Sequence, residues 1–123
     1  MASTIPFKLI TPTKVIFEGD AELVIAVTTE GEEGILPSHA PFLAALKPGV
    51  LRANVIVDGK PERLERATRE GFMQALPDRV TVLVDEAVRF EDVDVAKTRD
   101  ELARATDPAA IDFANAKLRL TGH

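Results

Sequence analysis

The pair Ser38-His39 is the first place where residue types suggest chemistry, because a serine beside a histidine is a pairing that nucleophilic catalysis uses. Neighbouring side chains of an extended chain point to opposite faces, however, so these two cannot readily meet. A metal site would have to combine His39 with Glu32 or Glu33, which supplies one good ligand and no second histidine at motif spacing. The other histidine, His123, ends the chain, where we expect fraying. We therefore interpret His39 as a loop residue that hydrogen-bonds to nearby backbone.

Neighbouring carboxylates are the next candidates, since two carboxyl groups held together can act as acid and base. The sequence has three such pairs: Glu32-Glu33, Asp85-Glu86 and Asp100-Glu101. Adjacent residues diverge on a strand or a helix, so we interpret all three pairs as solvated charge. The chain also lacks a G-x-S-x-G elbow, a P-loop and a G-x-G-x-x-G loop. The sequence thus predicts no catalytic residue, no metal ligands and no required cofactor.

The composition is that of a folded protein that does not bind nucleic acid. Of the 123 residues, 46% are hydrophobic and 28% are charged, which separates the chain from disordered sequences. The net charge of −5 would repel a nucleic-acid backbone, and no basic stripe with interleaved aromatic residues appears. Cysteine is absent, which excludes disulfides and thiolate ligands. The apolar runs are too short to span a bilayer and we find no signal-peptide pattern, so we expect any membrane role to be peripheral.

Residues 4–89 have the alternation and the turn signals of many short strands. We expect three sets of apolar side chains that each share one face of a strand: Val80, Val82 and Val84; Leu23, Ile25 and Val27; and Leu51, Ala53, Val55 and Val57. Asp58-Gly59 is a hairpin turn signal, and Pro61 after it indicates an edge strand, because proline cannot donate to an interior ladder. The close spacing and the lack of a helical period predict an antiparallel sandwich or a flattened barrel.

Toward the C-terminus the period of the apolar residues becomes helical. Asp92 or Asp94 is available as the N-cap of a first helix, and Asp107-Pro108 is typical of the start of a second. Gly122 is a stop signal. Two apolar stripes are expected: Val95, Leu102 and Ala105 on the first helix, and Ile111, Ala114 and Leu118 on the second. We predict two short helices packed as a hairpin.

The stretch EGEEGILPSHAPFLAALKPG is hard to explain as generic surface. Gly31 and Gly34 bracket two glutamates in what we expect to be a tight exposed turn. Pro37 and Pro41 stiffen the backbone on either side of His39. A stiff loop loses little entropy when it meets a partner, but the same residues would also make a rigid structural corner. The residues alone leave both interpretations open.

This stretch resembles the E-G-x-x-G-I-L-P-x-H-A-P-x-L-x-x-L-x-P-G signature of the epsilon subunit of F-type ATP synthases, the counterpart of the mitochondrial delta subunit. The segments FKLITPTKVIFEGDAELVIAVTTEGEEG and EGFMQALPDRVTVLVDEAVRFEDVD are also similar to that family, so the resemblance spans most of the chain. It implies a mostly β plus α fold. An antiparallel β-sandwich of about ten strands would occupy residues 1–89, and a short two-helix hairpin residues 90–123.

The resemblance also implies a non-catalytic rotor subunit, peripheral to the cytoplasmic face of the bacterial plasma membrane. In the family, the sandwich links the gamma subunit of the central stalk to the membrane-embedded ring of c subunits, so that ion-driven rotation is coupled to ATP synthesis. Glu32 takes the position of an acidic residue that faces the ring. The docking loop expected to meet the polar loops of the ring comprises Glu30, Gly31, Glu32, Glu33, Gly34, Pro37, His39 and Pro41.

The helical hairpin of this family is a regulatory brake, and in some members ATP favours its folded form. The family's ATP-sensing pattern, I/L-D-x-x-R-A, is similar to the segment with Ile111, Asp112, Asn115 and Ala116. Asn115 replaces the arginine that would contact phosphate in a bidentate manner. We expect a short, folded-down hairpin and weak inhibition, with regulatory ATP and contact with the alpha/beta catalytic head as open alternatives. A β-sandwich adaptor of an unrelated assembly and a small hydrolase built on the histidine and glutamates above are the alternatives in other functional classes.

Overall fold

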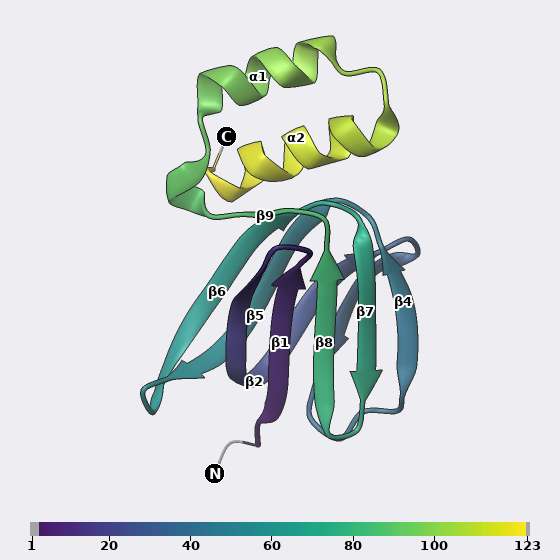
Figure 1. Ribbon diagram of the computed structural model, residues 1–123, viewed down its shortest axis with the longest axis vertical. Helices are drawn as coiled ribbons and strands as arrows, with labels where there is room; N and C mark the ends of the chain where they lie inside the picture. The colour runs from purple at the N-terminus through teal and green to yellow at the C-terminus, as the bar shows by residue number, and fades with distance from the viewer. Residues whose placement is uncertain (1–2, 123) are drawn as a thin grey trace.

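The computed structural model describes residues 3–122 and shows a β-sandwich with two antiparallel helices stacked across one end (Figure 1). The strands are β1 (Ile5–Thr11), β2 (Lys14–Thr28), β3 (Gly31–Ile35), β4 (Phe42–Leu46), β5 (Gly49–Val57), β6 (Lys60–Thr68), β7 (Gly71–Leu76), β8 (Arg79–Val84) and β9 (Ala87–Val88). A short 3-10 turn, η1 (Phe90–Asp92), leads to the helices α1 (Val95–Arg104) and α2 (Pro108–Leu120). None of the helices described is long and apolar enough to cross a membrane.

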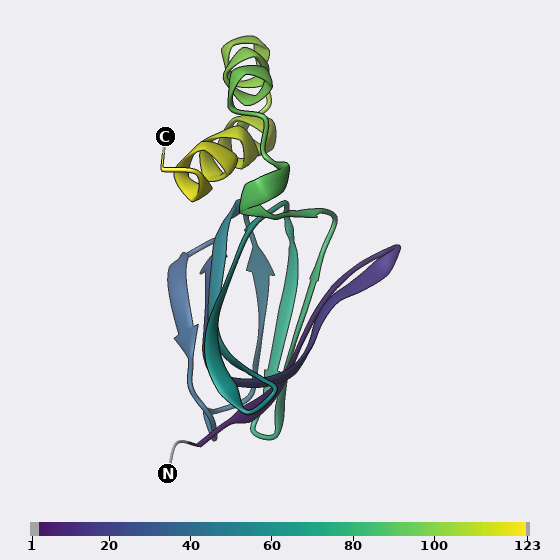
Figure 2. The same cartoon turned by 90° about the vertical axis from the view of Figure 1, so that its left-hand side faces the viewer.

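The strands form one sheet that folds over on itself into two layers (Figure 2). Their order is β1-β8-β7-β4-β2-β5-β6-β9, with β3 added beside β2. The fifteen-residue β2 is long enough to pair with β1, β3, β4 and β5. The predicted sandwich is confirmed, with nine strands in the described part of the chain.

One strand pair departs from the antiparallel expectation. β1 runs parallel to β8, with Phe7 opposite Val80 and Ile10 opposite Leu83, and it pairs on its other side with β2. The sequence signals were turn residues, which specify the direction of consecutive strands. β1 and β8 are far apart in the sequence, so no local signal reports their relative direction.

The sandwich core follows from the alternation of side chains, with one reversal. Val80, Val82 and Val84 share a buried face, and so do Leu51, Ala53 and Val55, while Val57 is half-buried. In β2, Leu23, Ile25 and Val27 share one face as predicted, but that face is half-buried, and Val24, Ala26 and Thr28 face the core. Ala21 is buried as well, so the core-facing positions change from odd to even numbers after it. The cause is an irregularity in the pairing with β5 between Ala21 and Leu23. A one-residue shift of this kind reverses which face each following side chain takes.

The hairpin between β5 and β6 has the predicted turn. Asp58 and Gly59 adopt positive φ angles of 52° and 76°, the conformation that a two-residue hairpin turn requires. Pro61 lies opposite Ile56 of β5. In the described chain, β9 pairs with the other edge of β6 only at Ala67 and Thr68, so Pro61 sits where that edge is open, as predicted.

Both helices begin at the predicted caps. The Asp94 carboxylate accepts a hydrogen bond from the Lys97 amide at 3.0 Å, and the Asp107 carboxylate accepts one from the Ala110 amide at 3.3 Å. Pro108 is the first residue of α2, where its missing amide hydrogen costs nothing.

The buried stripe of α2 is wider than predicted. Ala114 and Leu118 are buried and Ile111 is half-buried, but Phe113 and Ala116 are buried too. The reason is that α2 lies between α1 and the sandwich (Figure 1), so it needs apolar side chains on two sides.

Candidate functional site

The expected docking loop is mainly a strand rather than an exposed turn. The tight turn comes earlier, where the Thr28 hydroxyl accepts a hydrogen bond from the Glu30 amide at 3.1 Å and donates one to the Gly31 carbonyl at 2.7 Å. Gly31, with a φ of 120°, then begins β3, which pairs with the end of β2. The prediction of a turn bracketed by Gly31 and Gly34 was therefore wrong, because the threonine closes the turn before Gly31.

Successive glutamates of β3 have different environments because strand side chains alternate. Glu32 is held by Arg52 of β5, whose Nη2 atom donates to both carboxylate oxygens at 2.9 and 3.0 Å. Glu33 instead lines a hollow of about 330 Å³ together with Glu30, Phe42 and Leu43. The acidic groups available to a partner are thus Glu30, in the turn before β3, and Glu33 of β3, while the charge of Glu32 is balanced from within the chain.

His39 occupies a stiff corner after β3. Its Nδ1 atom lies 2.7 Å from the carbonyl oxygen of Ala40, and its ring meets Phe42 edge-on at 6.0 Å between centroids. The preceding residue, Ser38, has a positive φ of 67°. Pro37 is half-buried and Pro41 is exposed. The backbone contact agrees with the interpretation of His39 as a structural loop residue.

Residues 3–122 contain no group of three histidine, aspartate or glutamate side chains placed to hold a metal ion. His39 contacts backbone, and Glu32 is taken up by Arg52. The second histidine of the sequence, His123, lies outside the described residues. The residues proposed for a hydrolase are therefore not assembled into a site in the structure.

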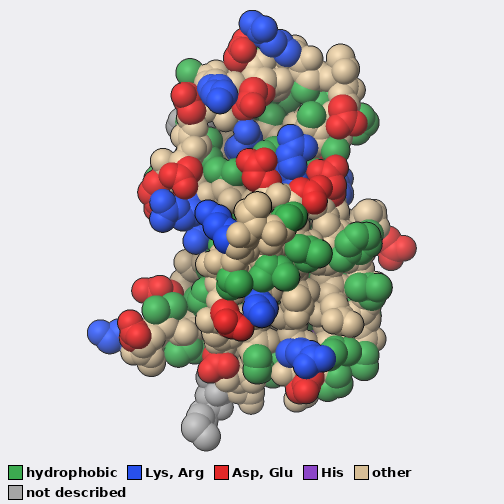
Figure 3. All heavy atoms as spheres, in the orientation of Figure 1, with side chains coloured by type: hydrophobic (Ala, Val, Ile, Leu, Met, Phe, Trp, Pro, Cys, Tyr) green, Lys and Arg blue, Asp and Glu red, His purple; other side chains and the backbone are tan. Residues whose placement is uncertain are grey.

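An exposed apolar surface crosses the outer side of β4, β7 and β8, and sequence reasoning missed it. This apolar sheet face consists of Leu43, Ala45, Phe72 and Leu83, which adjoin because Ala45 is opposite Phe72 and Phe72 opposite Leu83. Leu43 is 71% exposed, Phe72 57% and Leu83 42%. Figure 3 shows hydrophobic side chains gathered on this side of the molecule. Outward strand positions are normally polar, so Leu83 beside Arg79 and Thr81 was the available signal.

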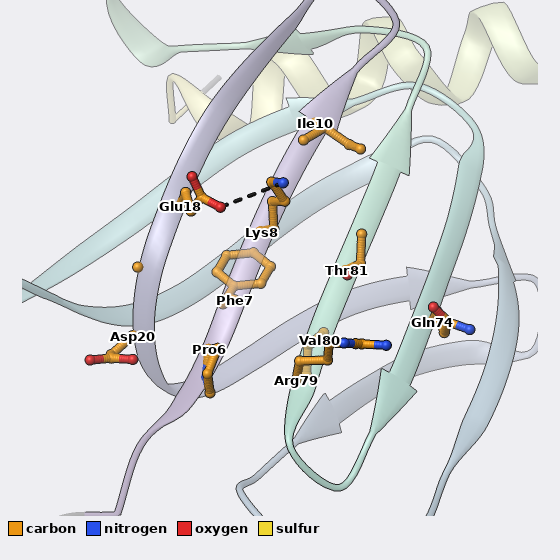
Figure 4. Close-up of a pocket in the computed structure, with 11 residues that line it drawn as sticks. Pro6, Phe7, Lys8, Ile10, Glu18, Asp20, Gln74, Arg79, Val80 and Thr81 are labelled. Carbon is orange, nitrogen blue, oxygen red and sulfur yellow. Dashed lines mark ion pairs between the residues drawn. The ribbon is translucent and has the colours of Figure 1, made fainter.

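A hollow of about 550 Å³ continues the same side of the sandwich over β1 and β2 (Figure 4). Lys8 and Glu18 form an ion pair across it at 3.5 Å. Arg79 and Asp20 supply further charge, and Gln74 joins the hollow to the apolar sheet face, being opposite Leu43 on β4. One side of the molecule therefore presents an apolar area beside a charged depression, a combination typical of protein-docking surfaces.

The residues of the degenerate ATP-sensing pattern all lie on α2. Asp112 pairs with Lys47 at 3.7 Å, and Ala116 is fully buried. Ile111 and Asn115 are half-buried. None of the four side chains carries the positive charge that would bind phosphate.

Both the sequence and the fold are similar to those of known proteins. The sequence model of the family described as "ATP synthase, Delta/Epsilon chain, beta-sandwich domain" matches residues 4–90. The chain belongs to this family.

Relatives and solved structures agree with that assignment. An "ATP synthase epsilon chain" of Chromobacterium violaceum is 40% identical over 118 residues, covering 90% of this chain and 83% of the relative. One of Shouchella clausii is 37% identical over 115 residues, with 94% and 84% covered. The fold matches a chain in the Euglena gracilis mitochondrial ATP synthase structure (OSCP/F1/c-ring) with a TM-score of 0.68 at 20% identity, covering 97% of this chain and 78% of that one. A chain in the Tetrahymena thermophila central stalk/c-ring structure gives 0.61 at 17% identity, with 98% and 92% covered.

Proposed function

We propose that this chain is a non-catalytic rotor subunit that joins the gamma subunit to the c-ring of an F-type ATP synthase at the cytoplasmic face of the plasma membrane. Family membership supports the choice of this assembly. The single observation that supports docking is the apolar sheet face on the outside of the sandwich, with its adjoining charged hollow. Leaving leucine and phenylalanine side chains in water is unfavourable unless a partner covers them.

The apolar sheet face is the proposed contact with gamma. It lies on β4, β7 and β8, which are braced on both sides within one continuous sheet, so the surface is preorganised. A rigid surface loses little conformational freedom when it binds, which suits a part that transmits torque.

The docking loop is the proposed contact with the c-ring, and the structure changes which of its glutamates we assign to it. Glu30 and Glu33 line an open hollow beside Leu43, which fits a lysine or arginine side chain with its aliphatic stem. Glu32, previously expected to face the ring, is already paired with Arg52. We assign Glu33 the role of steering basic ring-loop residues, and Glu32 that of holding β3 against β5.

The helical hairpin is proposed to remain folded on the sandwich and to act as at most a weak brake. Phe113 is buried with Arg69 Cζ 4.6 Å from its ring centroid and Lys117 Nζ 4.7 Å from it. Lys117 is also bonded to Glu101 of α1 at 3.1 Å. These contacts join both helices to β6 and its following turn without a nucleotide, so no cofactor is part of the proposal.

The test is reconstitution of an ATP synthase depleted of its own epsilon subunit, from the same source. The double change Phe72→Ser and Leu83→Ser should reduce incorporation by at least roughly tenfold, because it removes two exposed apolar side chains that gamma would cover. Val15→Ser, at an apolar residue 53% exposed but outside the face, is the matched control and should incorporate normally. Equal incorporation of both variants would exclude this face as the gamma contact.

The same reconstituted enzyme distinguishes the proposed role of Glu33 from that of Glu32. Glu33→Gln should lower ATP-driven ion pumping relative to hydrolysis, whereas Glu32→Gln should leave their ratio nearly unchanged. The opposite ranking would return the ring contact to Glu32.

A further inference from the structure

A third hollow, separate from the two described above, gathers positive charge from three segments of the chain. It has a volume of about 290 Å³ and lies where the start of β2, the middle of β6 and the segment after β9 meet. Lys14, Arg66 and Arg89 line it, one from each segment. The β1–β2 hairpin projects from the sandwich (Figure 2). Lys14, Val15 and Ile16, at the start of β2, line one side of the hollow. The apolar sheet face and the docking loop contribute nothing to this hollow.

Among the three cations, Arg66 is the one with a buried hydrogen-bond donor that lacks an acceptor among the described residues. Its Nη1 atom donates to the carbonyl oxygen of Glu65 at 2.8 Å, but its Nε–H is buried and has no hydrogen-bond partner among the described residues. Burial, followed by repulsion from Arg89, lowers the pKa of the Arg66 guanidinium. A buried donor without an acceptor is costly, and a guanidinium that is both desolvated and facing a like charge is more so.

The carboxylates nearby compensate only part of this charge. Arg89 donates from Nε to Asp92 at 3.2 Å and lies 3.8 Å from Glu91. This hydrogen bond to Asp92 raises the pKa of Arg89. Three cations therefore face two carboxylates, which leaves one formal positive charge in the hollow. Within residues 3–122, Arg89 pairs with Glu91 and Asp92, and Lys14 has no ion-pair partner.

We propose that this hollow binds a phosphate group through Lys14, Arg66 and Arg89. A guanidinium presents two parallel N–H groups to an oxyanion, and a tetrahedral phosphate has enough oxygens to serve two guanidinium groups and an ammonium together. A carboxylate has one negative charge and two acceptor oxygens, so it offers three cations less charge and fewer acceptor sites than a phosphate does. The small volume and the half-buried walls at Ile16 and Ala87 favour a single phosphate or the phosphate end of a larger molecule.

Binding there would add a link between the β1–β2 hairpin and the part of the fold where β6 and β9 are already paired. The phosphate would hold the β1–β2 hairpin, β6 and the segment that leads to the helices around one ligand. This inference does not depend on the proposed rotor function, since the residues are not part of either docking surface.

The experiment follows the side-chain Nε–Hε signals of the arginines by NMR in the full-length, ¹⁵N-labelled chain. Inorganic phosphate, glycerol 3-phosphate and acetate are titrated separately, with sodium chloride keeping the ionic strength constant, because salt alone screens exposed charges. We expect saturable shifts of Arg66 and Arg89 with inorganic phosphate and none with acetate. If glycerol 3-phosphate also gives saturable shifts, the site takes the phosphate end of a larger molecule. If glycerol 3-phosphate gives none, the site takes the free phosphate ion.

Variants then test the assignment. Arg66→Gln and Arg89→Gln should each weaken phosphate binding by about tenfold or more. Arg99→Gln removes the same charge from the exposed face of α1 and should bind as the unchanged chain does. Should Arg66→Gln fail to fold, Arg89→Gln, which alters an exposed side chain, decides the matter. Unsaturated shifts, saturation by acetate, or equal weakening in Arg99→Gln would overturn the proposal.

Discussion

Gly71 is a position of the sheet at which a residue with a side chain does not fit unless the backbone moves. It opens β7 opposite Val84 of β8 and Leu46 of β4. A Cβ atom at this position would overlap the carbonyl oxygen of Leu83 and lie 2.7 Å from the Cα atom of Val84. Both are backbone atoms, so no side-chain rotation relieves the overlap. Gly34 of β3 contrasts with it, since an added Cβ would meet Leu23 at 3.6 Å and Ile25 at 4.0 Å, both ordinary contacts with side chains.

We predict that Gly71→Ala lowers the free energy of unfolding by about 2–3 kcal/mol, because β7 and β8 must separate to admit the methyl group. Gly34→Ala should change it by less than about 0.5 kcal/mol. Urea denaturation of the two variants beside the unchanged chain measures both values. Similar losses for the two would show that β8 yields easily at this point.

At this scale, the sequence could name the charged residues of the docking loop but not rank them. Glu32 and Arg52 meet because Ile25 of β2 lies opposite both Gly34 of β3 and Arg52 of β5. Such a contact depends on the register of three strands, and single-sequence patterns do not specify register between distant strands. The local contact of His39 with backbone was predictable because it involves only its neighbour.

At the scale of elements, the docking of the helical hairpin depends on the residues against which α2 packs. Its buried side toward the sandwich consists of Phe113 and Ala116, which pack with Val50 and Ala67. Phe113 combines a buried aromatic ring with contacts to two cations. We therefore expect it to contribute more than any other residue of α2 to the free energy with which the hairpin docks on the sandwich.

We predict that Phe113→Ala weakens hairpin docking by about 3 kcal/mol, through lost burial and a cavity. Phe113→Leu keeps most of the apolar volume and loses mainly the contact with the cations, so about 1–2 kcal/mol is expected. Hydrogen exchange of the α2 amides measures the opening free energy directly. Should exchange rise equally in α2 and in β8, the hairpin and the sandwich would unfold as one unit instead.

The elements themselves were largely predictable, and the exceptions have a common cause. Turns and caps such as Asp58-Gly59 and Asp107-Pro108 act within a few residues and appeared where expected. The reversal of faces in β2 and the second buried side of α2 depend on neighbours distant in sequence. A local sequence pattern does not identify those neighbours.

On the scale of the whole molecule, the apolar interior has two parts. The larger cluster fills the sandwich, with Phe7, Leu51 and Val82 among its members, while a smaller one joins α2 to the end of the sandwich. The two clusters share no buried residue. The smaller cluster combines Val50 and Ala67 of the sandwich with Phe113 and Ala116 of α2, so the division between residues 1–89 and 90–123 stays a prediction.

We predict that a chain ending at Arg89 folds, with a free energy of unfolding about 1–3 kcal/mol lower because Val50 and Ala67 become exposed. Far-UV circular dichroism and urea denaturation test the fold. Added to the depleted synthase, it should support the same rate of ATP hydrolysis as the full chain, as expected of a tail that packs without braking. Faster hydrolysis with the short chain would make the hairpin a true inhibitor.

The parallel pairing of β1 with β8 has a consequence for the order of events during synthesis. The first strand leaves the ribosome early, and its hairpin with β2 can form at once. Its other edge, from Phe7 to Ile10, stays open until Val80 to Leu83 have emerged. Until then the nascent chain exposes backbone groups able to recruit a foreign strand, the interval in which a chaperone would protect it. Production should therefore be limited by translation speed and chaperone supply more than by the stability of the finished sandwich.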